Sequence, residues 1–400
     1  MLGDLKVLEV ADAMTGPLCG LFLSDLGAHI IKIEPPEWKR SLEVRVARRD
    51  DPGFLSWNRG KKSVVLDLTA PRGRKIFEEL VSKSDVVLSN NPPSVVKKLG
   101  LLYETLSRIN PRIICCNVSG YGLRGKNVER PAYDLAIQAV SGIMSITGEK
   151  GSKTPVRAGI PVADGNGGIL ATLGILAAYI SRQKEGKGQQ VDISMFDCLL
   201  PYLSHSALDY YLTGTIPEPV GSYSSAIKRA DYRAYQTKDG YIVVASGRGE
   251  DKWQAFCKAL GEEKLAKDSQ FDSFKKRITE KARVELEQIF ESIFRTKATE
   301  DWLKIFATAD IPSAPINTLD KVLKEAEDQG RGMIINFPLP SGEIVKGIGN
   351  PLKMGVPENV NPPPRFGEHT KEVLTKLLNY NEEAILELAK DKVIFLEGWT

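Results

Sequence analysis

Short apolar runs alternate with longer amphipathic stretches through the first half of the chain. The runs are rich in Val, Ile and Leu and are bounded by turn-forming residues, which is typical of buried strands. The predicted strands are residues 5–10, 30–34, 64–66, 86–88, 113–118 and 191–194. The predicted helices cover about 15–26, 71–82 and 101–109, and a further helix follows residue 164. This alternation predicts an α/β fold with a parallel sheet and helices on both faces.

The pattern changes after about residue 212. Residues 213–235 are rich in Gly, Pro, Ser and Tyr, and we interpret them as a linker or active-site loop. A second domain is predicted over residues 236–330. Its predicted elements are a strand at 241–245, charged amphipathic helices over about 250–310 and a break at 311–316. Beyond it the chain is strand-like from about 331, and a final helix is predicted over about 370–391.

Composition and charge narrow the classes of function. The chain has 400 residues, enough for two domains, and 42% of them are hydrophobic and 26% charged. The net charge of +3 is too small to indicate nucleic-acid binding. There is no apolar run of about 18 residues and no signal-peptide pattern, so we expect no membrane partner. Five scattered cysteines without a CxxC pair favour the reducing cytoplasm.

Histidine is scarce in this chain. His29, His205 and His369 are the three histidines, and none is spaced with another in the manner of metal ligands. We therefore expect no metal site. The search for catalytic groups shifts toward carboxylates.

Asp164 is the most informative carboxylate. It lies in a window of small residues, 159–168, just before an apolar run over 169–180 that predicts a helix. A carboxylate at a helix start can cap the helix. Because small neighbours admit a substrate and helix N–H groups favour the charged form, the same carboxylate can also be a nucleophile. The local window leaves both interpretations open.

Other segments combine turn residues with polar or charged side chains. Thr15-Gly16-Pro17 begins a helix after a strand, where phosphates are often bound. The absence of a GxGxxG or Walker motif disfavours an NAD or ATP site. The basic turn at 58–63, together with Arg40, Lys97 and Lys98, is either a solvated surface or a set of phosphate contacts. Asp134 is either a cap of its own helix or a site residue.

Taken in order, these segments resemble the class III coenzyme A transferases. That family includes formyl-CoA transferase and carnitine CoA-transferase, and the α-methylacyl-CoA racemases are closely related. The matching segments are Thr15-Gly16-Pro17, Leu26-Gly27-Ala28, Ile31-Lys32-Ile33-Glu34, Asn58-Arg59-Gly60-Lys61-Lys62-Ser63, Asn110-Pro111-Arg112, Ser119-Gly120-Tyr121-Gly122, Pro131-Ala132-Tyr133-Asp134 with Gln138, Asp164, Gly174–Ala178, Gly186–Gln189, Ile311–Pro315 and Gly367-Glu368-His369-Thr370. Each is weak alone, but the ordered set is specific and covers nearly the whole chain.

The resemblance implies an acyl-CoA:carboxylate CoA-transferase with Asp164 as its nucleophile. Asp164 takes the place of the family aspartate, 30 residues beyond Asp134. In such enzymes the carboxylate attacks an acyl-CoA thioester and is converted, through a mixed anhydride, into an aspartyl-CoA thioester. A carboxylic acid acceptor then removes the CoA. Coenzyme A is therefore expected as a substrate thioester, with neither a metal nor NAD.

The resemblance also implies which residues contact CoA and the substrate. These are Met14, Thr15, Arg40, Asn90, Lys98, Tyr133 and Asp134. Lys98 stands where an arginine is usual, and a lysine lacks the bidentate fork of arginine. Met14 replaces a glutamine of formyl-CoA transferase. The glycine run that covers the active site in that enzyme is absent. These departures disfavour formyl-CoA and oxalate as substrates.

Two alternatives to transfer are an α-methylacyl-CoA racemase and a non-catalytic CoA-ester-binding subunit. The racemases use a His-Asp pair where this chain has Tyr133-Asp134. Because an ordinary phenol has a pKa of about 10, it is a poor base at neutral pH, which favours the transferase. The intact Asp164 argues against a non-catalytic role.

The family fold implies a Rossmann-like large domain and a smaller inserted α+β domain. The large domain is expected over 1–212 with a C-terminal return over 331–400, and the small domain over 236–330. Members form interlocked homodimers, so an interlocked homodimer is expected.

Overall fold

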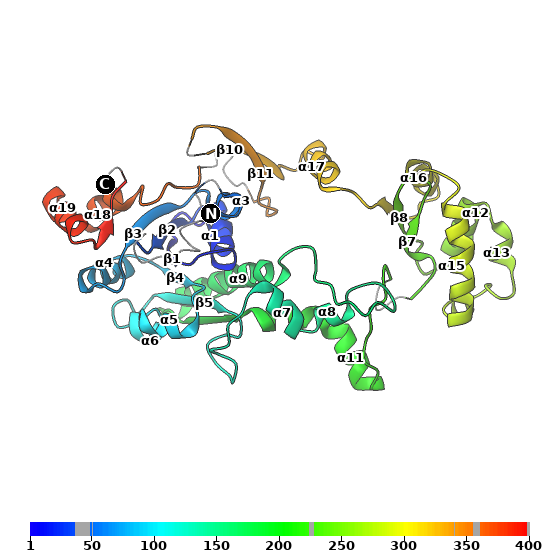
Figure 1. Cartoon of the computed structure of the whole chain (residues 1–400), viewed down its shortest axis with the longest axis horizontal. Coiled ribbons are helices and arrows are strands. Elements are labelled where there is room, and N and C mark those ends of the chain that lie inside the picture. Colours follow the sequence, from blue (N-terminus) through cyan, green and yellow to red (C-terminus); the bar gives the residue numbers. More distant parts are fainter. Residues whose placement is uncertain (37–48, 50, 224–227, 340, 355–360, 398–400) are drawn as a thin grey trace. The chain divides into compact units, whose positions relative to one another are not determined.

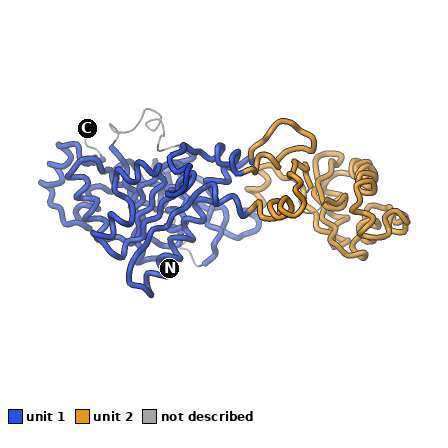
Figure 2. Tube along the Cα trace, turned by 90° about the horizontal axis from the view of Figure 1, so that it is seen from below, with its two compact units in different colours: residues 1–141, 158–201, 326–400 blue, residues 142–157, 202–325 orange. Residues whose placement is uncertain are grey.

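The computed structural model describes residues 1–36, 49, 51–223, 228–339, 341–354 and 361–397. The chain forms two compact units (Figures 1 and 2). Unit 1 contains residues 1–141, 158–201 and 326–400, and unit 2 contains residues 142–157 and 202–325. Unit 2 is therefore inserted into the sequence of unit 1.

Unit 1 is built on a seven-stranded sheet with the order β12-β3-β2-β1-β4-β5-β6 (Figure 1). Its strands are β1 (Lys6–Val10), β2 (His29–Glu34), β3 (Lys62–Leu66), β4 (Val86–Ser89), β5 (Ile114–Ser119), β6 (Gln190–Ser194) and β12 (Ile394–Phe395). Six strands are parallel, whereas β12 pairs with β3 in the antiparallel direction. The predicted α/β class with a parallel sheet is confirmed.

Helices cover both faces of this sheet. Those of unit 1 are α1 (Thr15–Asp25), α3 (Pro52–Asn58), α4 (Pro71–Ser82), α5 (Pro93–Lys98), α6 (Tyr103–Leu106), α7 (Asp134–Val140), α9 (Val162–Glu185), α10 (Met195–Leu199), α18 (Thr370–Leu378) and α19 (Glu382–Lys390). Apolar side chains of α4, α5, α6, α18 and α19 form one buried core with alternate strand residues such as Leu8 and Ile31. Since strand side chains alternate between faces, Glu9 and Lys32 lie on the opposite face. That second face is covered by α1 and α9.

Three expectations for secondary structure are wrong in detail. The helix predicted over 101–109 is only the short α6, and α5 precedes it. The single helix predicted over 370–391 is two helices, because Asn379 adopts a left-handed conformation with φ of 61° and ends α18. The segment expected only to break helices at 311–316 contains β9 (Ser313–Pro315), which pairs with β8 (Tyr241–Ala245).

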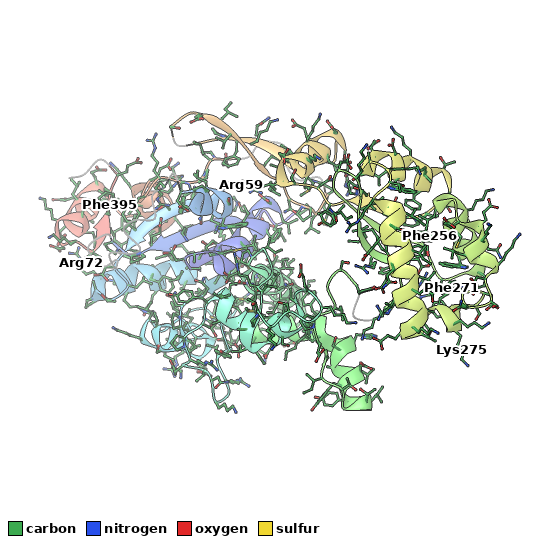
Figure 3. All side chains as sticks on the ribbon, turned by 45° about the vertical axis from the view of Figure 1, so that its right-hand side comes forward. Arg59, Arg72, Phe256, Phe271, Lys275 and Phe395 are labelled. Atoms are coloured by element: carbon green, nitrogen blue, oxygen red, sulfur yellow. The ribbon has the colours of Figure 1, made fainter. Side chains whose placement is uncertain are left out.

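Unit 2 combines a three-stranded antiparallel sheet, β7-β8-β9, with amphipathic helices. Its further elements are β7 (Tyr232–Gln236), α8 (Ile143–Ile146), α11 (Ser204–Thr213), α12 (Glu250–Leu260), α13 (Glu263–Lys267), α14 (Phe274–Arg277), α15 (Glu280–Phe294) and α16 (Thr299–Thr308). The core is aromatic; Phe256 and Phe271 are buried in it (Figure 3). Helix α17 (Leu319–Asp328) follows, and the hairpin β10 (Ile334–Pro338) and β11 (Ile344–Ile348) belongs to unit 1.

Candidate active site

The start of α1 meets the start of α9 at a hydrogen bond between two predicted site residues. Thr15 Oγ1 donates to Asp164 Oδ1 at 2.5 Å. Two glycines allow the helices to come this close. A Cβ on Gly167 would lie 2.8 Å from Thr15 Cγ2, and one on Gly168 would lie 2.9 Å from the Thr15 carbonyl oxygen. These small residues therefore admit α1, whereas such a Cβ on Gly165 would meet nothing within 4 Å in the part of the chain that the structure describes.

Asp164 does not cap α9, contrary to one interpretation of its sequence window. The helix begins at Val162, so Asp164 is its third residue, and the cap position holds Pro161 without a side-chain hydrogen bond. The cap comes instead from another helix. Asp134 Oδ1 accepts the backbone N–H groups of Ala163 at 2.8 Å and of Asp164 at 3.3 Å. Asp134 thus supplies a carboxylate at the positive end of α9.

Asp134 is itself held by a buried glutamine. Gln138 is fully buried, and its Nε2 donates to Asp134 Oδ2 at 2.6 Å. The side-chain oxygen of Gln138 accepts the N–H of Ala158 at 3.0 Å. Gln138 therefore connects Asp134 to the segment that leads into α9. Sequence reasoning noted Gln138 only as a matching residue; its i, i+4 spacing from Asp134 on one helix was the available signal.

The environment of Asp164 works against ionisation on balance. Burial raises the pKa of the Asp164 carboxyl, the Thr15 hydroxyl opposes that effect, and the negative charge of Asp134 adds to it. The expectation that helix N–H groups act directly on this carboxylate is wrong, because those N–H groups donate to Asp134. Asp164 Oδ2 accepts no hydrogen bond from the described residues, so one carboxylate oxygen is available for reaction.

The predicted CoA contacts do not all gather around Asp164. Asn90 accepts the N–H of Asp12 and donates to its carbonyl oxygen, at 3.0 and 2.7 Å, so its amide holds the β1–α1 loop. Met14 lies at the cap position of α1, partly buried. Tyr133 precedes α7 and is 84% exposed. Arg40 lies outside the described residues.

Lys98 lies at a separate cleft of about 340 Å³. The cleft is at the carboxyl ends of β1, β2 and β3, which is where ligands bind in open α/β sheets. Asn91 and Thr69 line it together with Lys98. Across the described residues, no group of three His, Cys, Asp or Glu side chains is arranged to hold a metal ion. No helix in that part of the chain is long and apolar enough to cross a membrane.

Unit 1 is thus a mainly parallel α/β unit that places a half-buried aspartate in the first turn of α9. The model of CoA-transferase family III matches residues 2–370, and this chain belongs to that family. The resemblance drawn from the ordered motifs is thereby confirmed, as is the expectation of a CoA-transferase.

Curated relatives carry transferase names with different acids. The chain is 33% identical over 398 residues to the succinyl-CoA:glutarate CoA-transferase of Homo sapiens, covering 98% of this chain and 90% of that protein. It is 33% identical over 354 residues to the acetyl-CoA:oxalate CoA-transferase of Acetobacter aceti, covering 88% of each. A crystal structure of a CAIB/BAIF family protein from Brucella suis matches with a TM-score of 0.80 and 32% identity, covering 94% of this chain and 99% of that one.

Proposed function

We propose that this chain transfers coenzyme A from an acyl-CoA donor to a carboxylic acid acceptor through a covalent intermediate on Asp164. The observation that carries the proposal is the hydrogen bonding and surroundings of the Asp164 carboxylate. One carboxylate oxygen is held by Thr15, the other accepts no hydrogen bond from the described residues, and a Cβ on the adjacent Gly165 would meet none of their atoms within 4 Å. This arrangement suits a nucleophile that must meet a thioester carbonyl.

The reaction proceeds by four exchanges at one carboxylate. Asp164 Oδ2 attacks the donor thioester carbonyl, and the CoA thiolate leaves, which forms a mixed anhydride. The thiolate then attacks the aspartyl carbonyl carbon and releases the donor acid. The acceptor carboxylate attacks the resulting aspartyl-CoA thioester, which releases the CoA thiolate and forms a second mixed anhydride. The thiolate then attacks the acceptor carbonyl of that anhydride, which forms the acceptor CoA thioester and restores the Asp164 carboxylate. Each step exchanges one acyl bond for another, so no oxidant or reductant is needed.

Thr15 has a specific task in this mechanism. When the thiolate attacks the aspartyl carbonyl, negative charge develops on the oxygen that was Oδ1. The Thr15 hydroxyl already donates to that oxygen and can stabilise the charge without rearrangement. By orienting the Asp164 carboxylate, the Thr15 hydroxyl also directs Oδ2 toward the acyl-CoA donor.

The remaining predicted contacts belong to CoA and substrate recognition. We propose that Lys98 and its cleft hold polar groups of CoA, since a lysine offers a point charge to phosphates. Met14 and Tyr133 are proposed to border the acyl group, and Asn90 to fix the β1–α1 loop. Arg40 is proposed to add positive charge for CoA recognition. The names of the relatives support succinyl-CoA as the first donor to test and glutarate as the first acceptor. Oxalate, which appears in the name of another relative but is disfavoured by the sequence departures at Met14 and in the glycine run, serves as the contrasting acceptor.

A homodimer and a reducing compartment complete the proposal. Apolar side chains that α7 and α9 leave exposed support a second copy as their partner. They are Leu135 (53% exposed), Ile169 (50%), Leu173 (60%) and Ile180 (61%). Interlocking of the two chains follows from the family resemblance alone.

The five cysteines are free and buried, which supports a cytoplasmic location.

A direct assay tests the proposal. Purified protein is incubated with succinyl-CoA and a panel of mono- and dicarboxylic acids, and the formation of each new CoA thioester is followed by mass spectrometry. Transfer to at least one acid, lost in Asp164→Asn, is expected. Undiminished transfer in a folded Asp164→Asn protein contradicts the assignment.

A further inference from the structure

Three charged side chains are buried beneath α1, on the sheet face away from the large apolar core. They are Glu9 on β1, Lys32 on β2 and Lys61 just before β3, exposed by 0%, 1% and 3% respectively. Two lysines share one carboxylate: Lys32 Nζ lies 3.0 Å from Glu9 Oε1 and Lys61 Nζ lies 2.7 Å from Glu9 Oε2. Buried charges are costly, so a buried lysine needs carboxylate partners. Lys32 also faces the charges of Asp12 and Glu34, whereas Lys61 contacts the Glu9 carboxylate, so the role of Lys61 is sought in its other contacts.

Each ammonium group also binds a backbone carbonyl. Lys32 Nζ donates to the carbonyl oxygen of Ala11 at 2.6 Å, and Lys61 Nζ donates to that of Pro17 at 2.8 Å. The third donor of Lys61 goes to Asn58 Oδ1 at 3.2 Å, so its three N–H bonds all have acceptors. These two carbonyls flank the segment that carries Thr15. The cluster thus holds the β1–α1 loop from both ends.

Close packing of α1 on this cluster depends on Gly20. A Cβ at Gly20 would lie 1.9 Å from Glu9 Oε2 and 3.1 Å from Lys61 Nζ. The helix consequently lies directly on the charged cluster, and its first turn is placed against α9. The hydrogen bond from Thr15 to Asp164 is at the end of this chain of contacts.

We propose that Lys61 is a positioning residue for CoA transfer: by holding the Pro17 carbonyl, it places α1 so that the Thr15 hydroxyl meets Asp164. The inference rests on the proposed function of Asp164 and adds a residue that touches neither substrate nor nucleophile. Burial lowers the pKa of Lys61 to about 8, and the neighbouring Glu9 carboxylate opposes that effect.

A double-mutant cycle between Lys61→Met and Thr15→Val tests this role. Methionine fills similar space and leaves Glu9 paired with Lys32. We expect Lys61→Met and Thr15→Val each to lower kcat by roughly ten- to a hundredfold with little change in KM. Because both act through the same hydroxyl, the double variant is expected to be no slower than Thr15→Val alone. The proposal would be overturned by a double variant whose fold-loss of kcat is the product of the two single losses. An unchanged kcat in Lys61→Met would also overturn it.

Two further variants separate positioning from a loss of folding. Lys252→Met is the control, since Lys252 also pairs with a carboxylate, that of Asp310 at 2.8 Å, but belongs to unit 2; it is expected to keep the wild-type kcat. Gly20→Ala keeps every charge but pushes α1 away from Glu9. Gly20→Ala is expected to reproduce the kcat loss and its lack of additivity with Thr15→Val. If Gly20→Ala retains full kcat, the placement of α1 does not control Thr15 and the inference fails.

A readout independent of turnover distinguishes this inference from the proposed function. The Thr15 hydroxyl lowers the pKa of Asp164, so its loss raises that pKa. Titration of the Asp164 carboxyl carbon by NMR is expected to give an upward shift in both Thr15→Val and Lys61→Met. A wild-type protein that transfers no CoA defeats the proposed function, whereas an unshifted Asp164 in Lys61→Met defeats only the positioning role.

Discussion

Asp134 Oδ1 accepts the backbone N–H of Asp164 at 3.3 Å, although Asp134 begins α7 and Asp164 lies in the first turn of α9. The Asp134 carboxylate therefore caps α9, and the Asp164 carboxylate does not cap its own helix. The capping interaction, one of the two roles that the sequence window left open for Asp164, belongs to Asp134. The nucleophilic role is the one we propose for Asp164.

Removal of the capping carboxylate lowers stability and activity together. In Asp134→Ala the N–H groups of Ala163 and Asp164 lose their acceptor, which costs about 0.5–2 kcal/mol of unfolding free energy. Because the start of α9 also carries Asp164, kcat is expected to fall by roughly tenfold or more. Thermal unfolding and initial rates measure the two effects.

Asp51→Ala is the matched control for that change. Asp51 caps α3 by accepting the N–H groups of Gly53 and Phe54. Its loss is expected to lower stability by a similar amount and to leave kcat unchanged. A kcat loss equal to that of Asp134→Ala would mean that any lost cap disturbs the enzyme.

Gln138 is expected to affect the rate through Asp134. Gln138→Met removes the donor to Asp134 and leaves the partly buried N–H of Ala158 without this acceptor, at a cost of about 0.5–1.5 kcal/mol. Gln138→Glu retains an acceptor for Ala158 but places a second carboxylate against Asp134. We expect the Glu variant to lose more kcat than the Met variant, as measured by single-turnover CoA release. The opposite order would contradict this role.

The close approach of α1 and α9 depends on Gly167 and Gly168. Alanine at Gly168 places a Cβ against the Thr15 carbonyl oxygen, so transfer is expected to slow by roughly tenfold. At Gly165 a Cβ meets no atom of the described residues within 4 Å, and Gly165→Ala should stabilise the helix by up to about 1 kcal/mol. Gly168→Ala is expected to lower the free energy of unfolding and Gly165→Ala to raise it, and chemical unfolding of both variants measures these two changes. A stabilised Gly168→Ala would contradict the packing argument.

The pH dependence of transfer follows from the raised pKa of Asp164. The attacking group is the carboxylate, so kcat/KM falls as the pH drops through a pKa above the ordinary value of 3.8. The folded state then binds this proton more tightly than the unfolded state, so ionised Asp164 destabilises the fold above that pKa. Asp164→Asn is expected to unfold at a higher temperature than wild type at pH 7, and the difference should shrink in acid. A lower Tm for this variant at pH 7 would contradict the raised pKa.

An isotope experiment separates transfer from racemisation. A chiral 2-methylacyl-CoA is incubated with the protein in D₂O without an acceptor acid. Racemisation requires a base that removes the α-proton, which then exchanges with solvent, and Tyr133 replaces the histidine that serves as such a base in the racemases. No deuterium is expected at that carbon, and its incorporation would favour the racemase alternative.

Much of the sheet could be predicted because its strands are buried on both faces. The run at 86–88 falls within β4, since a buried parallel strand is commonly apolar throughout. The run at 30–34 falls within β2 although that strand also buries Lys32 and Glu34. The two-residue β12 could not be predicted from pattern. Its place at the sheet edge depends on the return of the chain after α19.

The site could be predicted only in part, for a similar reason. Asp164 was identifiable from its window and its place in an ordered set of motifs. Thr15 and Asp134 were implied as site residues by the resemblance, but their contacts with Asp164 could not be predicted, because Thr15 comes from 149 positions away and Asp134 lies on another helix, α7. The only local signal for Gln138 was its i, i+4 spacing from Asp134. Lys61 carries no local signal of its contacts, since a buried lysine and an exposed one look alike in sequence.

Trapping of the covalent intermediate tests the central claim most directly. The protein is incubated with succinyl-CoA, treated with hydroxylamine or borohydride, digested and examined by mass spectrometry. The account predicts a hydroxamate or a reduced side chain at Asp164, present with donor and absent without it. Robust CoA transfer by the wild-type protein with no modification at Asp164, or with modification at another residue instead, would contradict it.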